Sequence, residues 1–142
     1  MTNVEKVHQI YAAFGRQDIL AILQRLADSI EWEYGVNATV VPWLQPRRGR
    51  AEVADFFSAL SALEIHSFQP KTFLESGNIV VVLIDVEATV KATGRKIVEE
   101  DEVHIWHFDP EGQVSRFRHR ADTYQHLVAH TNEVSREAAA AG

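Results

Sequence analysis

Apolar residues recur at helical spacing over three stretches in the first half of the chain. The first runs from Val4 to Phe14, after a Thr2-x-x-Glu5 pattern that is typical of a capped helix start, and Gly15 ends it. A second helix is expected after Asp18, and a third follows residue 50. Their apolar stripes are Ile19, Leu23, Leu26 and Ile30 for the second helix, and Val53, Phe56, Phe57 and Leu60 for the third.

The pattern changes to alternation between and after these helices. Residues 29–34 predict a short strand, with Trp32 on one face and Glu33 on the other. Residues 36–48 contain two prolines and no clear period, which predicts a long loop. Four further strands and a short helix capped by Asp122 are expected. The strands cover 65–74, 78–91, 96–108 and 113–121, and the helix covers 122–130.

This segregation of helices and strands predicts an α+β fold, with three helices of the N-terminal half packed on a curved antiparallel sheet. Straight helices cannot seal a bent sheet, so we expect a cavity between the layers. The 142 residues suffice for one domain, which we place at 1–130. The tail, 131–142, has little to bury and is expected to be frayed.

The turns allow an estimate of strand register. If Thr93-Gly94 is a two-residue loop, Asp85 lies opposite Glu102 and Leu83 lies opposite His104. A two-residue loop at Pro110-Glu111 then adds the last strand. One bulge would reverse part of this assignment. The expected inner face carries Leu83, Asp85, Glu102, His104, Trp106, Phe117 and His119, and the other face carries Val82, Ile84, Val86, Val103, Ile105, Arg116 and Arg118.

Carboxylates beside imidazoles form the unit of acid–base chemistry near neutral pH. On the expected inner face, Asp85, Glu102, His104 and His119 would lie beside aromatic walls, which shift pKa values by excluding water. Glu102, His104 and His119 would also suit a metal as a facial triad. The other face offers apolar residues under arginine stems, which suit a dimer surface.

The net charge of −6 disfavours a nucleic-acid partner, since phosphate binding requires a basic face. With no cysteine, the chain has neither disulfides nor thiolate chemistry, which fits a reducing compartment. No apolar run approaches the roughly 20 residues of a membrane span. We therefore expect a cytoplasmic protein that binds neither membranes nor nucleic acids.

The order of these elements resembles the SnoaL-like branch of the nuclear transport factor 2-like superfamily over roughly residues 2–130. The similar motifs are the Gly-Arg-Gln-Asp turn at 15–18, the segments LQRLADSIEWE and RGRAEVADFF, and the final DPEGQVSRFRHRADTY. The superfamily includes ketosteroid isomerases, polyketide cyclases and limonene epoxide hydrolases. The resemblance implies a cone-shaped α+β barrel, no metal or cofactor, and a homodimer.

The resemblance also implies roles for four residues. Tyr11 matches the tyrosine that donates to the oxyanion in ketosteroid isomerases, and Glu33 falls near their carboxylate base. His104 matches the position of their second oxyanion donor. His119 stands where cyclases and epoxide hydrolases carry an essential aspartate, so the chain departs from both families there.

These observations predict acid–base chemistry on a small apolar ketone, enol or lactone. The expected catalytic residues are Tyr11, Glu33, Glu102, His104 and His119. Two alternatives remain open: a non-catalytic module that binds a hydrophobic metabolite, and an accessory dimerisation domain. The expected pocket lining consists of Phe14, Trp32, Phe57, Leu83, Asp85, Trp106 and Phe117.

Overall fold

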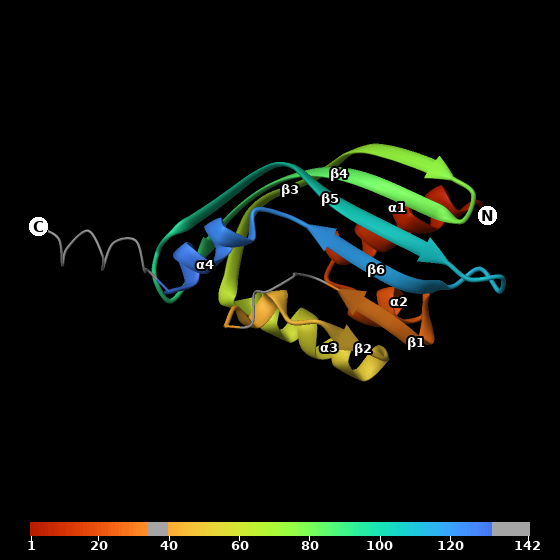
Figure 1. The fold of residues 1–142 in the computed structure, drawn as a ribbon, viewed down its shortest axis with the longest axis horizontal. Coiled ribbons are helices and arrows are strands. Elements are labelled where there is room, and N and C mark those ends of the chain that lie inside the picture. The colour runs from red at the N-terminus through yellow and green to blue at the C-terminus, as the bar shows by residue number, and fades with distance from the viewer. Residues whose placement is uncertain (34–39, 132–142) are drawn as a thin grey trace, which may run out of the picture.

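The computed structural model describes residues 1–33 and 40–131. Four α-helices and two short 3₁₀ helices lie in this part of the chain (Figure 1). The α-helices are α1 (Asn3–Gly15), α2 (Ile19–Leu23), α3 (Arg50–Ala59) and α4 (Thr123–Thr131), and the 3₁₀ helices are η1 (Pro42–Leu44) and η2 (Leu60–Ala62). The predicted tail lies outside the described residues apart from Thr131.

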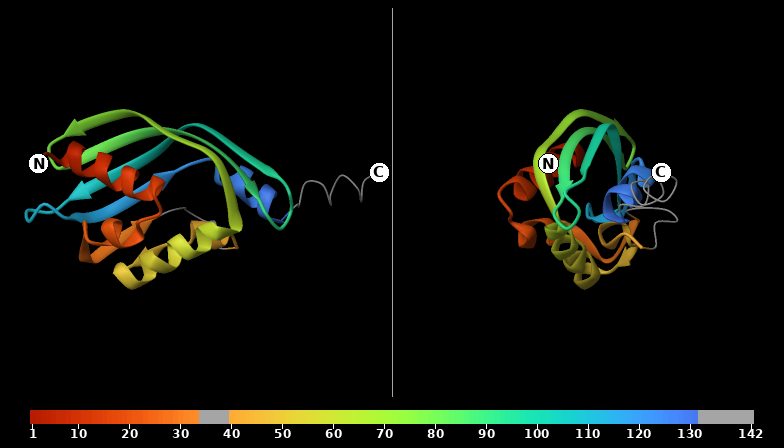
Figure 2. Two further views of the ribbon diagram at one scale, coloured as in Figure 1. Left: turned by 180° about the vertical axis from the view of Figure 1, so that it is seen from behind. Right: turned by 90° about the vertical axis from the view of Figure 1, so that its left-hand side faces the viewer.

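Six strands form one curved, unclosed sheet in the order β2-β1-β6-β5-β4-β3. All neighbours are antiparallel except β1 and β6, which run parallel. Seen end-on, the strands arch over helices that lie across the open side (Figure 2). The predicted α+β fold is therefore confirmed. The strands are β1 (Leu26–Glu33), β2 (Arg47–Arg48), β3 (Leu63–Ser76), β4 (Ile79–Val90), β5 (Lys96–Phe108) and β6 (Val114–Arg120).

The capping signals that predicted the helices are present. Thr2 and Glu5 form a reciprocal capping box at the start of α1, and Asp18 accepts a hydrogen bond from the Ala21 backbone at the start of α2. The predicted extent of the second helix is wrong, because α2 ends at Leu23. Leu26 and Ile30 are instead buried residues of β1, where hydrogen bonding to the sheet outweighs their helical spacing.

Part of the predicted loop at 36–48 is ordered core. In its described portion, Val41, Trp43 and Leu44 are almost completely buried, and Arg47–Arg48 pairs with β1 as an edge strand. Trp43 donates a hydrogen bond from Nε1 to Nδ1 of His126 on α4, over 2.9 Å. This contact attaches the loop to the helix at the far end of the sheet. Within the described residues, no helix has both the length and the apolar character that a membrane span requires.

A bulge in β5 makes the predicted β4–β5 register wrong by one residue. Glu102 pairs with Ile84 rather than Asp85, and His104 pairs with Val82 rather than Leu83. The loop before β5 is longer than the predicted two residues, and near it Thr89 pairs with Lys96. This longer loop changes the pairing by two residues, which by itself would leave each side chain on its predicted face. The extra residue, at Asp101 with a φ of 60°, reverses them. The β5–β6 register differs from its prediction by two residues, so those faces are as expected.

Candidate functional site

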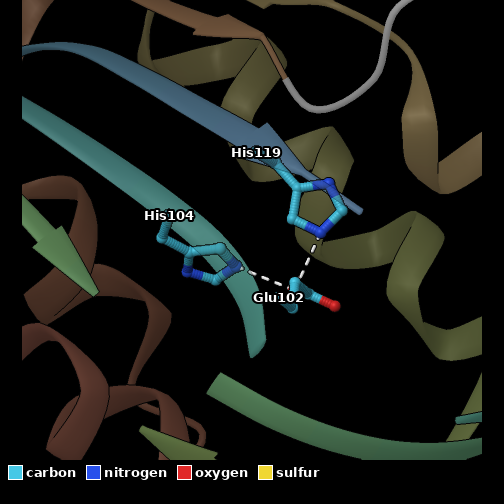
Figure 3. Close-up of side chains that lie close together, drawn as sticks. All are labelled: Glu102, His104 and His119. Carbon is cyan, nitrogen blue, oxygen red and sulfur yellow. Dashed lines mark hydrogen bonds and ion pairs between the residues drawn. The ribbon is translucent and has the colours of Figure 1, made fainter. Parts of the chain in front are cut away.

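A carboxylate and two imidazoles meet on the concave face of the sheet (Figure 3). Oε1 of Glu102 lies 2.9 Å from Nε2 of His104 and 2.8 Å from Nε2 of His119. The three residues come from neighbouring positions of β5 and β6, where His104 pairs with His119. All three are buried, with exposed fractions of 4% or less. The predicted association of Glu102 with both histidines is therefore present.

Tyr11 on α1 extends this cluster toward the helices. Its hydroxyl lies 2.8 Å from Nδ1 of His104 and 3.0 Å from Nε1 of Trp106. An indole N–H can only donate, so the Tyr11 oxygen accepts from Trp106. The lowered pKa of His104 favours a neutral ring, which accepts the Tyr11 hydrogen. His104 Nδ1 is then an acceptor, and its Nε2–H donates to Glu102. With the lowered pKa of His104, the contacts fit a neutral ring that is held between a phenol and a carboxylate.

The electrostatics agree with this assignment. Burial is the main cause that lowers the pKa of His104, although Glu102 opposes the shift. Burial disfavours ionisation of Glu102, but the adjacent His119 and His104 outweigh it and hold the pKa of Glu102 well below its usual range. Burial raises the pKa of Tyr11 well above 10. At neutral pH the arrangement is therefore a neutral phenol, a neutral His104 and an ionised Glu102.

A second buried polar group lies beside the first. Nε2 of His126 is 3.2 Å from Oε1 of Glu99, and the Glu99 carboxylate also accepts the backbone N–H of Asp122. Because Trp43 donates to His126 Nδ1, the hydrogen of this imidazole is on Nε2 and donates to Glu99. Ligand atoms of Glu99, Glu102 and His126 lie within 4.8 Å of one another.

The bulge explains why two carboxylates three residues apart share one face. In regular alternation, Glu99 and Glu102 would point to opposite sides of the sheet. The extra residue at Asp101 turns both inward and leaves Glu100 and Asp101 exposed. On the convex side, Nζ of Lys71 lies 2.8 Å from Asp85 and 2.6 Å from Asp101, across the bulged strands.

Two inner cavities of about 40 Å³ each flank the polar cluster. Tyr11 and His104 belong to the wall of the first cavity, whereas Glu102 and His126 belong to the wall of the second. Both cavities adjoin a surface groove of about 780 Å³. The other residues of the first wall are apolar or aromatic: Ile10, Phe14, Ile22, Trp32, Phe56, Phe57, Leu60, Phe68, Trp106 and Phe117.

Most of the predicted lining is in place. Phe14, Trp32, Phe57, Trp106 and Phe117 all line the first cavity. Trp32 and Phe117 stack with ring centroids 4.1 Å apart, which fixes this wall.

Three predicted site residues lie away from the cluster. Glu33 is on the convex face, where its carboxylate is 3.0 Å from Arg118 and 38% exposed. Asp85 is also on the convex face, where it binds Lys71. Leu83 lies on the same face as Asp85, because the bulge in β5 changes the pairing with β4 by one residue. Glu33 follows buried Trp32 in regular alternation, so the strand itself turns it outward.

Four other residues of the site were not expected from the sequence: Trp43, Phe68, Glu99 and His126. Trp43 lies in a segment without periodicity, and Phe68 lies in a weakly patterned strand. Glu99 faces inward only because of the bulge. His126 carried a usable signal, since it is one of two histidines on the polar-looking helix that follows the capping residue Asp122.

Two sets of side chains lie close enough to hold a metal ion: Glu102 with His104 and His119, and Glu99 with Glu102 and His126. The second set is unsuited, because Trp43 occupies Nδ1 of His126 and leaves a hydrogen on Nε2. The first set is chemically suited. Metal binding at Nε2 would require His104 to change tautomer, with its hydrogen on Nδ1 and donated to the Tyr11 oxygen, which can accept as well as donate.

Comparisons with known proteins support the same fold. An NTF2-like protein of unknown function from Burkholderia pseudomallei has 28% identity and a TM-score of 0.81, covering 92% of this chain and 99% of its own. An NTF2-like protein from Burkholderia xenovorans has 29% identity and a TM-score of 0.78, covering 89% and 94%. TerC, crystallised with polyporic acid, has 27% identity and a TM-score of 0.75, covering 86% and 92%.

No curated protein is significantly similar to this chain in sequence. The model of the SnoaL-like domain matches residues 7–117, which include most of α1, the sheet up to Phe117 and most of the polar cluster. With its concave face, its aromatic cavity and the neighbours above, the chain belongs to the SnoaL-like domain family, within the nuclear transport factor 2-like superfamily.

Proposed function

We propose that this protein is an enzyme that performs cofactor-independent acid–base chemistry on a small apolar ketone, enol or lactone. The observation that carries the proposal is the continuous hydrogen-bonded series from Trp106 through Tyr11 and His104 to Glu102, with Tyr11 and His104 on the wall of an aromatic cavity. Many enzymes use a base that is oriented by a carboxylate and hydrogen-bonded to a hydroxyl group, because such a base can take the proton of that hydroxyl.

Proton transfer through Tyr11 keeps every charge where the site favours it. A substrate proton passes to the Tyr11 oxygen while the Tyr11 hydrogen passes to Nδ1 of His104. Tyr11 stays neutral, as its raised pKa requires, and donates its new hydrogen to the substrate anion. The resulting imidazolium lies 2.9 Å from ionised Glu102, which stabilises it. Return of the proton to another substrate atom completes an isomerisation or cyclisation.

The aromatic walls set the kind of ligand. The described wall of the first cavity is mostly apolar or aromatic, and Tyr11 and His104 are its polar groups in the hydrogen-bonded series. Each inner cavity is smaller than a single aromatic ring, so binding requires half-buried Phe14 and Phe68 to turn toward the groove that they also line. TerC, which was crystallised with polyporic acid, supports an aromatic, oxygen-rich ligand by similarity.

Hydrogen–deuterium exchange tests the proposal without knowledge of the product. Acetophenone and 1-indanone are incubated with the protein in D₂O, and loss of the α-proton signal is followed by NMR. We expect exchange about tenfold or more above buffer, which Tyr11→Phe and His104→Gln each reduce at least tenfold. Glu33→Gln is the matched control and keeps full exchange. Background-level exchange with the wild type on both ketones would refute the proposal.

The binding-module alternative is favoured by one observation: the donors and acceptors of Tyr11, His104 and Trp106 already satisfy one another without a ligand. Saturable binding of polyporic acid in isothermal titration calorimetry, together with background exchange, would select it over catalysis.

We also propose a homodimer through the convex face of β4 to β6. Leu83 pairs with Val103 there, and both are half-buried beside Arg118 and Arg120. Arginine stems over an apolar surface are common at interfaces. Light scattering at micromolar concentration should give twice the monomer mass, and Val103→Glu should halve it. A wild-type monomer would refute this proposal.

A further inference from the structure

The second inner cavity is lined by Glu102 but, among the described residues, not by His104 or His119, and the proposed chemistry does not use it. Apolar side chains of β3, β4 and β5 and the ring of Trp43 line it, and Glu102 and His126 are the charged or ionisable residues in the described part of its wall. Three half-buried side chains, Phe14, Leu60 and Phe68, line the first cavity, the second cavity and the surface groove alike. These three side chains therefore lie between the two cavities and also border the surface groove.

The two oxygens of Glu102 have different surroundings. Oε1 receives both histidines, at 2.9 and 2.8 Å. Oε2 has no hydrogen-bond partner among the described residues, although Glu102 is only 4% exposed. Figure 3 shows one carboxylate oxygen turned away from both rings. Glu102 also lines the second cavity, so a carboxylate oxygen that no described residue bonds can accept a hydrogen bond from a group in that cavity.

His126 does not supply that donor. Its Nδ1 accepts from Trp43, and its Nε2–H donates to Glu99. Both nitrogens are occupied, and the remaining wall of the second cavity is apolar apart from the Trp43 ring, whose N–H is already used. Among the described residues of its wall, the second cavity thus presents one charged acceptor with an oxygen that is not hydrogen-bonded, the Glu102 carboxylate.

We propose that the second cavity is a subsite for a hydrogen-bond donor of the ligand, and that the protein's ligands are single-ring aromatic hydroxyketones. The carbonyl oxygen lies at Tyr11 in the first cavity, and a hydroxyl on the opposite side of the ring donates to Oε2 of Glu102. This inference rests on the proposed function for the carbonyl end, and it adds the subsite that selects the hydroxyl end.

The spacing of the two ends supports a one-ring ligand. Tyr11 and Glu102 are separated by a single imidazole ring, with a hydrogen bond of 2.8 Å on one side and 2.9 Å on the other. A benzene ring that carries an acetyl carbonyl and a hydroxyl at its para positions has a similar span. Such a ligand enters when Phe14 and Phe68 turn toward the groove, which joins the two small cavities into one.

A matched ligand series tests the subsite on the wild-type protein. Dissociation constants of 4-hydroxyacetophenone, acetophenone and 4-methoxyacetophenone are measured by calorimetry, alongside exchange of their methyl protons in D₂O. A hydrogen bond to a charged acceptor predicts that the hydroxyl compound binds about tenfold tighter than the other two. Binding of acetophenone and 4-hydroxyacetophenone within threefold of each other would overturn the subsite and leave the proposed function standing.

Two variants sharpen the result. Ala88→Leu fills the second cavity far from Tyr11, and should abolish the preference for the hydroxyl compound while acetophenone still binds and exchanges. Glu102→Gln retains an oxygen for the histidines and turns its amide N–H₂ to the cavity, so the preference should invert in favour of 4-methoxyacetophenone. An unchanged preference in a folded Glu102→Gln protein would overturn the proposal. If none of the three compounds binds or exchanges, the proposed function fails, and the subsite fails with it.

Discussion

The two faces of the sheet pair carboxylates with bases in very different surroundings. On the convex face, Glu31 binds Arg116 at 2.9 Å and Glu33 binds Arg118 at 3.0 Å, with a third or more of each side chain exposed. On the concave face, Glu102 binds two imidazoles at similar distances with 4% exposure. Distance alone therefore does not distinguish a surface ion pair from a chemical site; burial does.

Removal of the carboxylate should give the largest difference between the faces. Glu102→Ala leaves two buried imidazoles without their acceptor, and we expect the free energy of unfolding to fall by about 3–5 kcal/mol. Glu33→Ala removes an exposed pair and should cost less than about 1 kcal/mol. Denaturant unfolding of both variants measures this. Equal losses would show that burial is not the deciding variable.

The bulge that divides the faces can be tested at Asp101. Its left-handed backbone, with φ of 60°, is strained for a β-branched residue, so Asp101→Val should cost about 1–3 kcal/mol and disturb the ring signals of His104. Asp101→Gly loses the same contact with Lys71 but relieves the strain, and should stay within about 1 kcal/mol of the wild type. If valine is tolerated as well as glycine, the conformation of the bulge is not what turns Glu99 and Glu102 inward.

The Tyr11 hydroxyl links the concave face to α1. Tyr11→Phe leaves Trp106 Nε1 and His104 Nδ1 without their shared partner, and should lower stability by about 1–2 kcal/mol. Thermal unfolding checks the loss, and a change in Trp106 fluorescence should accompany it. Tyr124→Phe is the control, because that side chain is exposed and should be neutral.

The smallest expected difference between the two faces is in how the pKa values of their histidines depend on salt. Burial lowers the pKa of His104 on the concave face and of His107 on the convex face, where Arg116 and Arg118 add to the shift. Added salt should move the pKa of His107 toward its ordinary value, because salt screens the repulsion from the partly exposed Arg116 and Arg118. NMR titrations at low and high salt measure this change. The pKa of His104 should not move. A salt-sensitive His104 would indicate that water reaches the cluster.

Because the pKa values of His104 and Glu102 are lowered in the folded protein, the free energy of unfolding should fall as the pH falls. The unfolded chain binds a proton at His104 more readily than the folded chain, so this contribution to stability is present above about pH 6.5 and is lost as the pH falls toward the folded pKa. Glu102 is also lowered, so its contribution is lost in a more acidic range, below about pH 4.5. The His104→Gln variant should lack the first of these losses, which unfolding curves between pH 7 and pH 5 can measure.

Local chemistry explains what could be predicted. The capping box at Thr2 and the cap at Asp18 depend on neighbouring residues, and so does the alternation that places Glu102, His104 and Trp106 on one face. The aromatic residues of the first cavity also follow from their own strands and helices. These features together determined the α+β fold, the family resemblance and the association of Glu102 with His104 and His119, whereas the role of Tyr11 was expected only from the resemblance.

Long-range contacts decided the rest. A single extra residue at Asp101, supported across strands by Lys71 and Asp85, reversed the face of β4 and brought Glu99 inward. The contact of Trp43 with His126 joins segments 83 residues apart, and neither has a local pattern that predicts it. The sequence determined that Glu102, His104, Trp106, Phe117 and His119 line the concave face of β5 and β6. Only the tertiary structure decided that Glu102 presents one oxygen to the histidines and the other to a second cavity, because a strand's register is set by its neighbours.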